Sequence, residues 1–222
     1  MFSRLPQVTK VLLIANIAIF LLQQVLASPL EETFALWPFV PDAGSFGIGP
    51  SFMPWQLVSY AFLHGDWMHL LFNMLALVMF GAQLEQLWGT RRYLIYFSVC
   101  VIGAGLCQLV LASASVSQGG PVYSTLGASG GVFGLLLGYG MLFPNQRVML
   151  LIPPIPMKAR TLVIVYGALQ LLLGFTGLQP GVAHFAHLGG MLFGWLLILY
   201  WRRSRRPPSS SGRGPRHLRV VK

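Results

Sequence analysis

The stretch that decides the fold is SGGVFGLLLGYGMLF, residues 129–143, which is followed at once by Pro144. Pro144 should end a helix there. The helix would be roughly 21 Å long at about 1.5 Å per residue, whereas the hydrocarbon core of a bilayer is about 30 Å thick. If the helix ends near one membrane face, Ser129 lies roughly 10 Å below the other. Residues 113–126 would then enter the membrane without being helical, which requires a buried or water-lined pocket ending at Ser129.

The composition places this short helix in a membrane protein. Charged residues make up 9% of the 222 residues and hydrophobic residues 55%, and the mean hydropathy is +0.67. A typical soluble domain has about 25% charged residues. The apolar content excludes disorder, and the small polar surface argues against a soluble enzyme or a nucleic-acid-binding domain despite the net charge of +10.

Six apolar runs predict an all-α membrane protein built as a six-helix bundle. They are residues 11–27, 67–84, 94–112, 129–143, 161–175 and 182–201. All 15 Lys and Arg residues lie on one side of such a bundle, because segments 28–66, 113–128 and 176–181 contain none. The positive-inside rule then places both termini in the cytoplasm.

Two parts of the chain need separate interpretation. Residues 1–201 form the predicted membrane domain, and residues 202–222 form a basic, Arg/Pro/Ser/Gly-rich cytoplasmic tail that we expect to be disordered. The N-terminal run also resembles a signal peptide with a cleavage site near residues 25–27. Cleavage there would leave the other five helices oriented as before. Cys100 and Cys107 are a heptad apart on one helix, too far for a disulfide, and are expected to be packing residues.

An ionisable or strongly polar residue within a membrane span is by default a candidate for function. We consider His64, His69, Asn73, Ser129, His184 and His187. Ser129 lies in a G-x-S-x-G pattern at residues 127–131, which is typical of a nucleophile elbow but also of helix packing. No acidic residue follows Glu85. The Ser–acid–His order of the hydrolase fold with that motif is therefore excluded, and only a Ser–His dyad remains.

The depth of His187 supports such a dyad. It precedes Trp201, at the cytoplasmic end of its helix, by 14 residues or about 21 Å, which is the depth calculated for Ser129. His187, Gly190 and Gly194 share one helix face, and small residues on a membrane helix allow close approach of a neighbouring helix. His187 is thus the candidate general base for Ser129.

The helix at 67–84 offers donors for an oxyanion. His69 and Asn73 are four residues apart and so share a face. They are either oxyanion donors together with the Ser129 backbone N–H or polar contacts between helices. His64 is expected to order the adjacent loop. A zinc site built from histidines is a further alternative by ligand type, although the H-E-x-x-H spacing of metalloproteases is missing.

Three stretches together resemble the rhomboid family of intramembrane serine proteases. They are HGDWMHLLFN at 64–73, GASG at 127–130 and AHLGGMLFG at 186–194. The resemblance spans about residues 5–201 and is closest to the minimal six-helix bacterial form. It implies Ser129 as nucleophile and His187 as base, with neither cofactor nor metal.

The resemblance also implies supporting parts. His69 and Asn73 match the oxyanion residues, and Glu85 matches a structural acid. Segment 28–66 would be the external loop that lies partly in the membrane, while the fifth helix and residues 176–182 would form the substrate gate and cap. Two departures stand out: Gln56 replaces the arginine of a frequent Trp-Arg pair, and Phe133 replaces a frequent Tyr, so that stacking on His187 is retained without a phenol hydrogen bond.

These observations predict an intramembrane serine endopeptidase of the bacterial inner membrane, with its active site open to the periplasmic side. Its partners would be single-pass transmembrane substrates and the lipid bilayer, and no nucleic acid; the sequence does not specify an oligomeric state. The first alternative is a rhomboid-like protein that binds transmembrane helices without cleaving them. The second is a small transporter that uses the same polar pocket, which would more often show inverted repeats.

Overall fold

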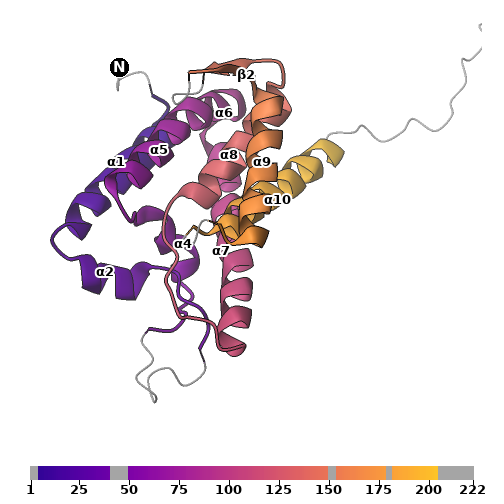
Figure 1. The fold of residues 1–222 in the computed structure, drawn as a ribbon. Helices are drawn as coiled ribbons and strands as arrows, with labels where there is room; N and C mark the ends of the chain where they lie inside the picture. The colour runs from indigo at the N-terminus through magenta and orange to yellow at the C-terminus, as the bar shows by residue number, and fades with distance from the viewer. Residues whose placement is uncertain (1–4, 41–49, 150–153, 179–181, 205–222) are drawn as a thin grey trace, which may run out of the picture.

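The computed structural model describes residues 5–40, 50–149, 154–178 and 182–204, and it shows a helical bundle with one small hairpin (Figure 1). Its elements are α1 (Gln7–Gln23), α2 (Ala27–Phe34), α4 (Gln56–Ser59), the 3-10 turn η2 (Tyr60–Phe62), α5 (Trp67–Ala76), the π-helical turn η3 (Leu77–Gly81), α6 (Ala82–Trp88), α7 (Thr90–Ser117), α8 (Ser129–Leu142), β1 (Arg147–Met149), β2 (Pro156–Lys158), α9 (Ala159–Thr176) and α10 (His184–Arg203). The predicted tail at 202–222 lies almost entirely outside the described residues.

Four helical stretches in the described part of the chain are long and apolar enough to cross a membrane. They are Trp67–Trp88, which joins α5, η3 and α6, and the helices α7, α9 and α10. Two of the six predicted runs form shorter apolar helices, α1 with 17 residues and α8 with 14. The short α8 begins at Ser129, as its sequence predicts.

The first predicted run, 11–27, was wrong in its boundaries, because α1 starts at Gln7 and ends at Gln23. The carboxylate of Glu85 explains the early start. It accepts hydrogen bonds from the backbone N–H groups of Val8 and Thr9 at 2.9 and 2.8 Å, and another from the Thr9 hydroxyl at 2.8 Å. The two N–H groups belong to the first turn of α1, where no carbonyl group within the helix can accept from them. Glu85 therefore caps α1 from a distant helix.

Two other expectations need correction. The helix predicted at 94–112 extends as α7 to Ser117, so the irregular entry to α8 is confined to residues 118–128 rather than 113–126. An all-helical chain was also expected, but β1 and β2 pair as an antiparallel hairpin between α8 and α9. The strands are only three residues each and contain Pro156 and two basic residues, which is too little for an alternating pattern to be recognised.

Glycines set the packing of α7, α8 and α10 in the core. A Cβ atom at Gly134 of α8 would overlap the Cys100 thiol of α7, and one at Gly194 of α10 would lie 3.0 Å from the same sulfur. The buried Tyr96 hydroxyl donates to the carbonyl of Gly134 at 2.8 Å. The three helices are thus fixed at close distance, and Cys100 is a packing residue with a free thiol.

The described residues of segment 28–66 are connected by Gln56, which stands where an arginine is frequent in the family. This side chain is 1% exposed, and its Oε1 accepts hydrogen bonds from the backbone N–H groups of Trp37 and Met53, each at 3.2 Å. Its amide Nε2 donates to the carbonyl of Thr33 at 3.3 Å. The helix α2, which sequence reasoning treated as part of a loop, is joined to the same network through Thr33.

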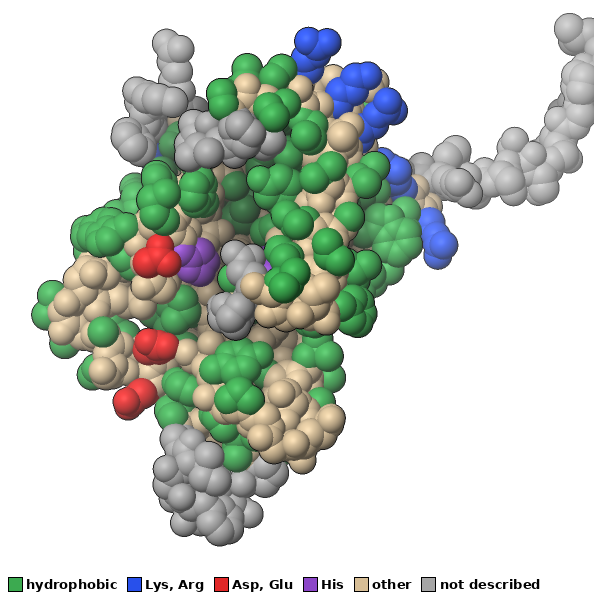
Figure 2. Space-filling model, viewed as in Figure 1, with side chains coloured by type: hydrophobic (Ala, Val, Ile, Leu, Met, Phe, Trp, Pro, Cys, Tyr) green, Lys and Arg blue, Asp and Glu red, His purple; other side chains and the backbone are tan. Residues whose placement is uncertain are grey.

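Charges are distributed unevenly along the bundle. Lys and Arg side chains gather at the end of the molecule that carries the hairpin, whereas the acidic side chains visible in this view lie farther from the hairpin (Figure 2). The basic end includes Lys158, just before α9, and Arg202 and Arg203 in the last turn of α10. The visible acidic groups are separated from them by an apolar belt, as expected for helices that cross a bilayer.

Candidate active site

Ser129 occupies the first position of α8, where an irregular segment enters the bundle. Polar backbone groups of this segment form hydrogen bonds with other parts of the chain. Thr125 and Leu36 exchange two backbone hydrogen bonds of 2.9 Å, and Gly127 N–H donates to the carbonyl of Tyr60 at 2.9 Å. Gly127 has φ 120°, and a Cβ atom there would lie 2.7 Å from His69 Nε2. Glycine is therefore required at 127 both for the backbone conformation and for the approach of His69.

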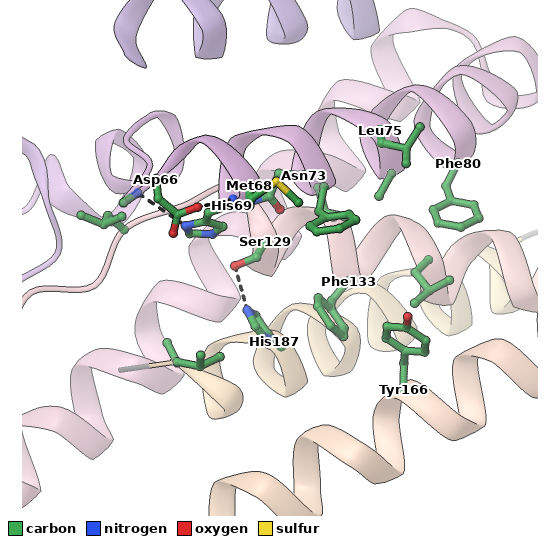
Figure 3. Close-up of a pocket in the computed structure, with 18 of the residues that line it drawn as sticks. Asp66, Met68, His69, Asn73, Leu75, Phe80, Ser129, Phe133, Tyr166 and His187 are labelled. Atoms are coloured by element: carbon green, nitrogen blue, oxygen red, sulfur yellow. Dashed lines mark hydrogen bonds between the residues drawn. The ribbon is translucent and has the colours of Figure 1, made fainter. Parts of the chain in front are cut away.

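Ser129 and His187 meet at one side of a cavity of about 810 Å³. The Ser129 hydroxyl oxygen lies 2.8 Å from His187 Nε2, and the two side chains point toward each other (Figure 3). The imidazole is 8% exposed, and the cavity is bordered by α5, η3, α8, β1 and α9. A hydroxyl and an imidazole at this distance have the geometry that nucleophilic catalysis requires.

Close contact between α8 and α10 makes this hydrogen bond possible. A Cβ atom at Gly190, one turn after His187, would overlap the carbonyl oxygen of Gly130, which follows Ser129. The two helices thus touch through backbone atoms beside the Ser–His pair. The small residues on the helix face of His187 predicted close approach of a neighbouring helix, and the structure contains this contact beside the Ser–His pair.

Phe133 fixes the orientation of the His187 ring on one side. The two rings are stacked, with centroids 4.3 Å apart and an interplanar angle of 4°. Phe133 is one turn after Ser129 on α8, so the same helix supplies the hydroxyl and the aromatic surface. The structure thus has the stacking that was expected of a Phe at this position.

His69 and Asn73 line the same cavity from α5 (Figure 3). The carboxylate of Asp66 caps this helix by accepting from His69 backbone N–H at 2.8 Å. Gly65 N–H lies 3.5 Å from His69 Nδ1, and the other ring nitrogen, Nε2, faces Gly127. His69 therefore presents a ring nitrogen toward the region around Ser129, and Asn73 is buried one turn further along.

The other two predicted supporting residues lie away from the Ser–His pair. Glu85 caps α1 as described above. His64 is buried, with its ring centroid 5.1 Å from that of His69, and its backbone N–H donates to the Gln23 side chain at 2.9 Å. Burial, and secondarily the neighbouring His69, lower the pKa of His64 to about 4. The backbone of His64 thus connects the end of α1 to the segment before α5, and its buried ring is neutral.

Sequence reasoning missed Gln170 of α9. Its side chain is 7% exposed, and its Oε1 lies 2.7 Å from the Nδ1 atoms of both His184 and His187. The signal was available, because Gln170 is a strongly polar residue within the apolar run 161–175. It was overlooked because only ionisable groups and motif residues were considered.

The fold and the site define a helical integral membrane protein with a hydrogen-bonded Ser–His pair beside an apolar cavity. The family model of the rhomboid domain matches residues 51–204. The chain belongs to the rhomboid family, which includes intramembrane proteases, as the resemblance of its three motifs predicted.

Individual relatives agree with this assignment. RHOMBOID-like protein 5 of Arabidopsis thaliana is 31% identical over 174 residues, covering 76% of this chain and 52% of the relative. RHOMBOID-like protein 4 of the same plant is 33% identical over 64% of this chain and 33% of the relative. Rhomboid protease GlpG of Yersinia pestis is 26% identical over 90% of this chain and 64% of the relative. The chain thus spans between one third and two thirds of the length of these relatives.

Proposed function

We propose that this chain is an intramembrane serine endopeptidase in which Ser129 is the nucleophile and His187 the general base. The observation that carries the proposal is the 2.8 Å hydrogen bond between the Ser129 hydroxyl and His187 Nε2 beside a large cavity. His187 takes the hydroxyl proton as the Ser129 oxygen attacks a peptide carbonyl, and later gives it to the leaving amine. Water then hydrolyses the acyl-enzyme.

The attack places negative charge on the former carbonyl oxygen, and donors on two elements support the proposal that it is stabilised. These are the Nε2–H of His69, the side-chain amide of Asn73 and the backbone N–H of Ser129. Such donors stabilise a transition state when they are held in place in a site of low dielectric constant. The cap of α5 by Asp66 and the close contact at Gly127 hold His69 in this position.

The cavity supports an extended apolar substrate. From Ser129 it continues past Phe80 and Leu136 to Val148 and Tyr166, between the α5–η3 segment and α9. The helix α9 packs on α8 and α10 and makes few contacts with α5. A segment of a single-pass transmembrane protein, unwound near the external face, is the proposed substrate, and it would enter on the side of α9. Residues 179–181 of the proposed cap lie outside the described part of the chain.

We further propose the six-helix topology of a bacterial inner-membrane protein. The short helices α1 and α8 would complete the bundle of residues 1–201, with both termini and the tail 202–222 in the cytoplasm. The basic side chains at the hairpin end support this orientation through the positive-inside rule. The site would then open to the periplasm, because Ser129 lies at the opposite end of α8 from the hairpin.

A fluorophosphonate probe tests the proposed chemistry without knowledge of the natural substrate. The purified full chain in detergent should be modified at Ser129, as located by mass spectrometry of the labelled peptide. Ser129→Ala should abolish labelling, and His187→Ala should reduce it strongly while the protein keeps its unfolding temperature. A native chain that binds transmembrane peptides but is never labelled would instead be a helix-binding protein without protease activity.

A further inference from the structure

A polar side chain from a third helix contacts the proposed base. Gln170 lies in the middle of α9, between Leu169 and Leu171, which are 42% and 48% exposed on the outer surface. Gln170 itself points inward and is 7% exposed. Its Oε1 is 2.7 Å from His187 Nδ1, on the ring edge opposite the nitrogen that faces Ser129.

We propose that Gln170 is a positioning residue that makes His187 a competent base. The inference rests on the proposed function and adds a neutral third member to the Ser–His pair. The amide oxygen accepts a hydrogen bond from Nδ1–H, so the single proton of the neutral ring resides on Nδ1. The other nitrogen, Nε2, is left with a lone pair directed at the Ser129 hydroxyl. The opposite tautomer would place two acceptors, Nδ1 and Oε1, against each other at 2.7 Å.

The role persists through the reaction without any proton transfer to Gln170. As the Ser129 oxygen forms its bond to the carbonyl carbon, its proton moves to Nε2 and His187 becomes an imidazolium. The Nδ1–H then donates to Oε1 as a charged donor, which strengthens this hydrogen bond. When the C–N bond breaks, the Nε2 proton goes to the leaving nitrogen, and His187 returns to the neutral tautomer that Gln170 selects.

An amide suits this position better than a carboxylate. An isolated negative charge inside a membrane is costly, whereas an amide oxygen provides an acceptor at no cost in net charge. Gln170 also has two lone pairs to use, because Oε1 lies 2.7 Å from His184 Nδ1 as well. This second hydrogen bond holds the carboxamide with its oxygen turned toward both rings, so His184 supports the arrangement one turn before His187.

The proposal makes a direct spectroscopic prediction. In the full chain labelled with ¹⁵N-histidine, the His187 signals, assigned by comparison with His187→Ala, should report protonated Nδ1 and unprotonated Nε2 at neutral pH. In Gln170→Leu the preference should be lost, with a mixture of both tautomers. A native His187 with its proton on Nε2, or an unchanged tautomer in Gln170→Leu, would overturn the inference. This readout does not depend on protease activity.

The labelling rate at Ser129 by a fluorophosphonate provides the matching kinetic test, because a small probe needs no docked substrate helix. Gln170→Leu should slow labelling about 10- to 100-fold. Gln170→Glu, which retains an acceptor oxygen at the same reach, should label faster than Gln170→Leu, although its buried charge should lower the unfolding temperature. Leu171→Ala, the control on the lipid-facing side, should leave it unchanged. If Gln170→Leu does not fold, Gln170→Met replaces it in both measurements.

The two measurements separate the two claims. If the native chain shows the Nδ1–H tautomer but the fluorophosphonate does not modify Ser129, the proposed function is refuted, while Gln170 remains the residue that orients His187. A native chain that is labelled at Ser129, together with a Gln170→Leu variant that matches it in rate and tautomer, would refute the role of Gln170 alone.

Discussion

The contact between α8 and α10 gives the sharpest prediction for a residue that takes no part in the chemistry. An alanine at Gly190 would place its Cβ on the carbonyl oxygen of Gly130. The carbonyl oxygen belongs to the helix backbone and the position of the Cβ is fixed by it, so neither atom can rotate away. To restore an ordinary contact the helices must separate by roughly 1 Å or more, since carbon–oxygen contacts are found at about 3.4 Å and beyond. The Ser129–His187 hydrogen bond of 2.8 Å would then exceed 3.5 Å and be lost.

A misplacement of about 1 Å at a catalytic pair costs roughly 100-fold in rate, and overpacking of a core costs about 1–3 kcal/mol of stability. Gly190→Ala should therefore label with fluorophosphonate about 100-fold more slowly than the native chain while it still folds. Gly167→Ala on α9 is the matched control, because its new Cβ meets only the Met191 side chain at 3.5 Å. Native labelling by Gly190→Ala, at a native unfolding temperature, would refute the close-contact explanation.

Three further variants test other parts of the site. Phe133→Ala removes the ring stacked on His187 and should slow labelling by roughly threefold to tenfold, because an aromatic pair contributes ~0.5–1.5 kcal/mol of interaction energy. Phe133→Tyr should label at the native rate. An unchanged rate in Phe133→Ala would refute the role of stacking. Asn73→Ala should lower kcat for a fluorogenic transmembrane substrate by at least ~10-fold with little change in KM, as for an oxyanion donor, whereas a change confined to KM would indicate a substrate contact. Glu85→Gln should lower the unfolding free energy by about 1–3 kcal/mol through the weakened cap on α1, yet leave the labelling rate of the folded protein unchanged; equal stability would argue against the cap.

The meeting of Ser129 and His187 could be predicted because it depends on helix rise alone. Both residues lie about 14 positions from the predicted cytoplasmic ends of their helices, and a rise of about 1.5 Å per residue gives both the same depth. Gly190 and Gly194, on the same helix face as His187, indicated in addition that a neighbouring helix can approach closely. These arguments need only local periodicity and the thickness of a bilayer, which a single sequence provides.

Other features depend on contacts between distant segments and were missed. The early start of α1 depends on Glu85, which is 76 residues away from Thr9 in the chain. The local sequence around α1 does not indicate such a cap. The hairpin after α8 is too short to show alternation. The acceptor at Gln170 was missed for another reason: only ionisable groups and motif residues were considered, and Gln170 is neither.

Cleavage of a labelled single-span transmembrane protein in liposomes tests the central claim most directly. The native chain should produce two fragments with one cut near the external end of the span, as located by mass spectrometry. Ser129→Ala and His187→Ala should both produce none while reaching the same level in the membrane. Cleavage that persists in both variants would contradict a mechanism in which Ser129 attacks and His187 accepts its proton.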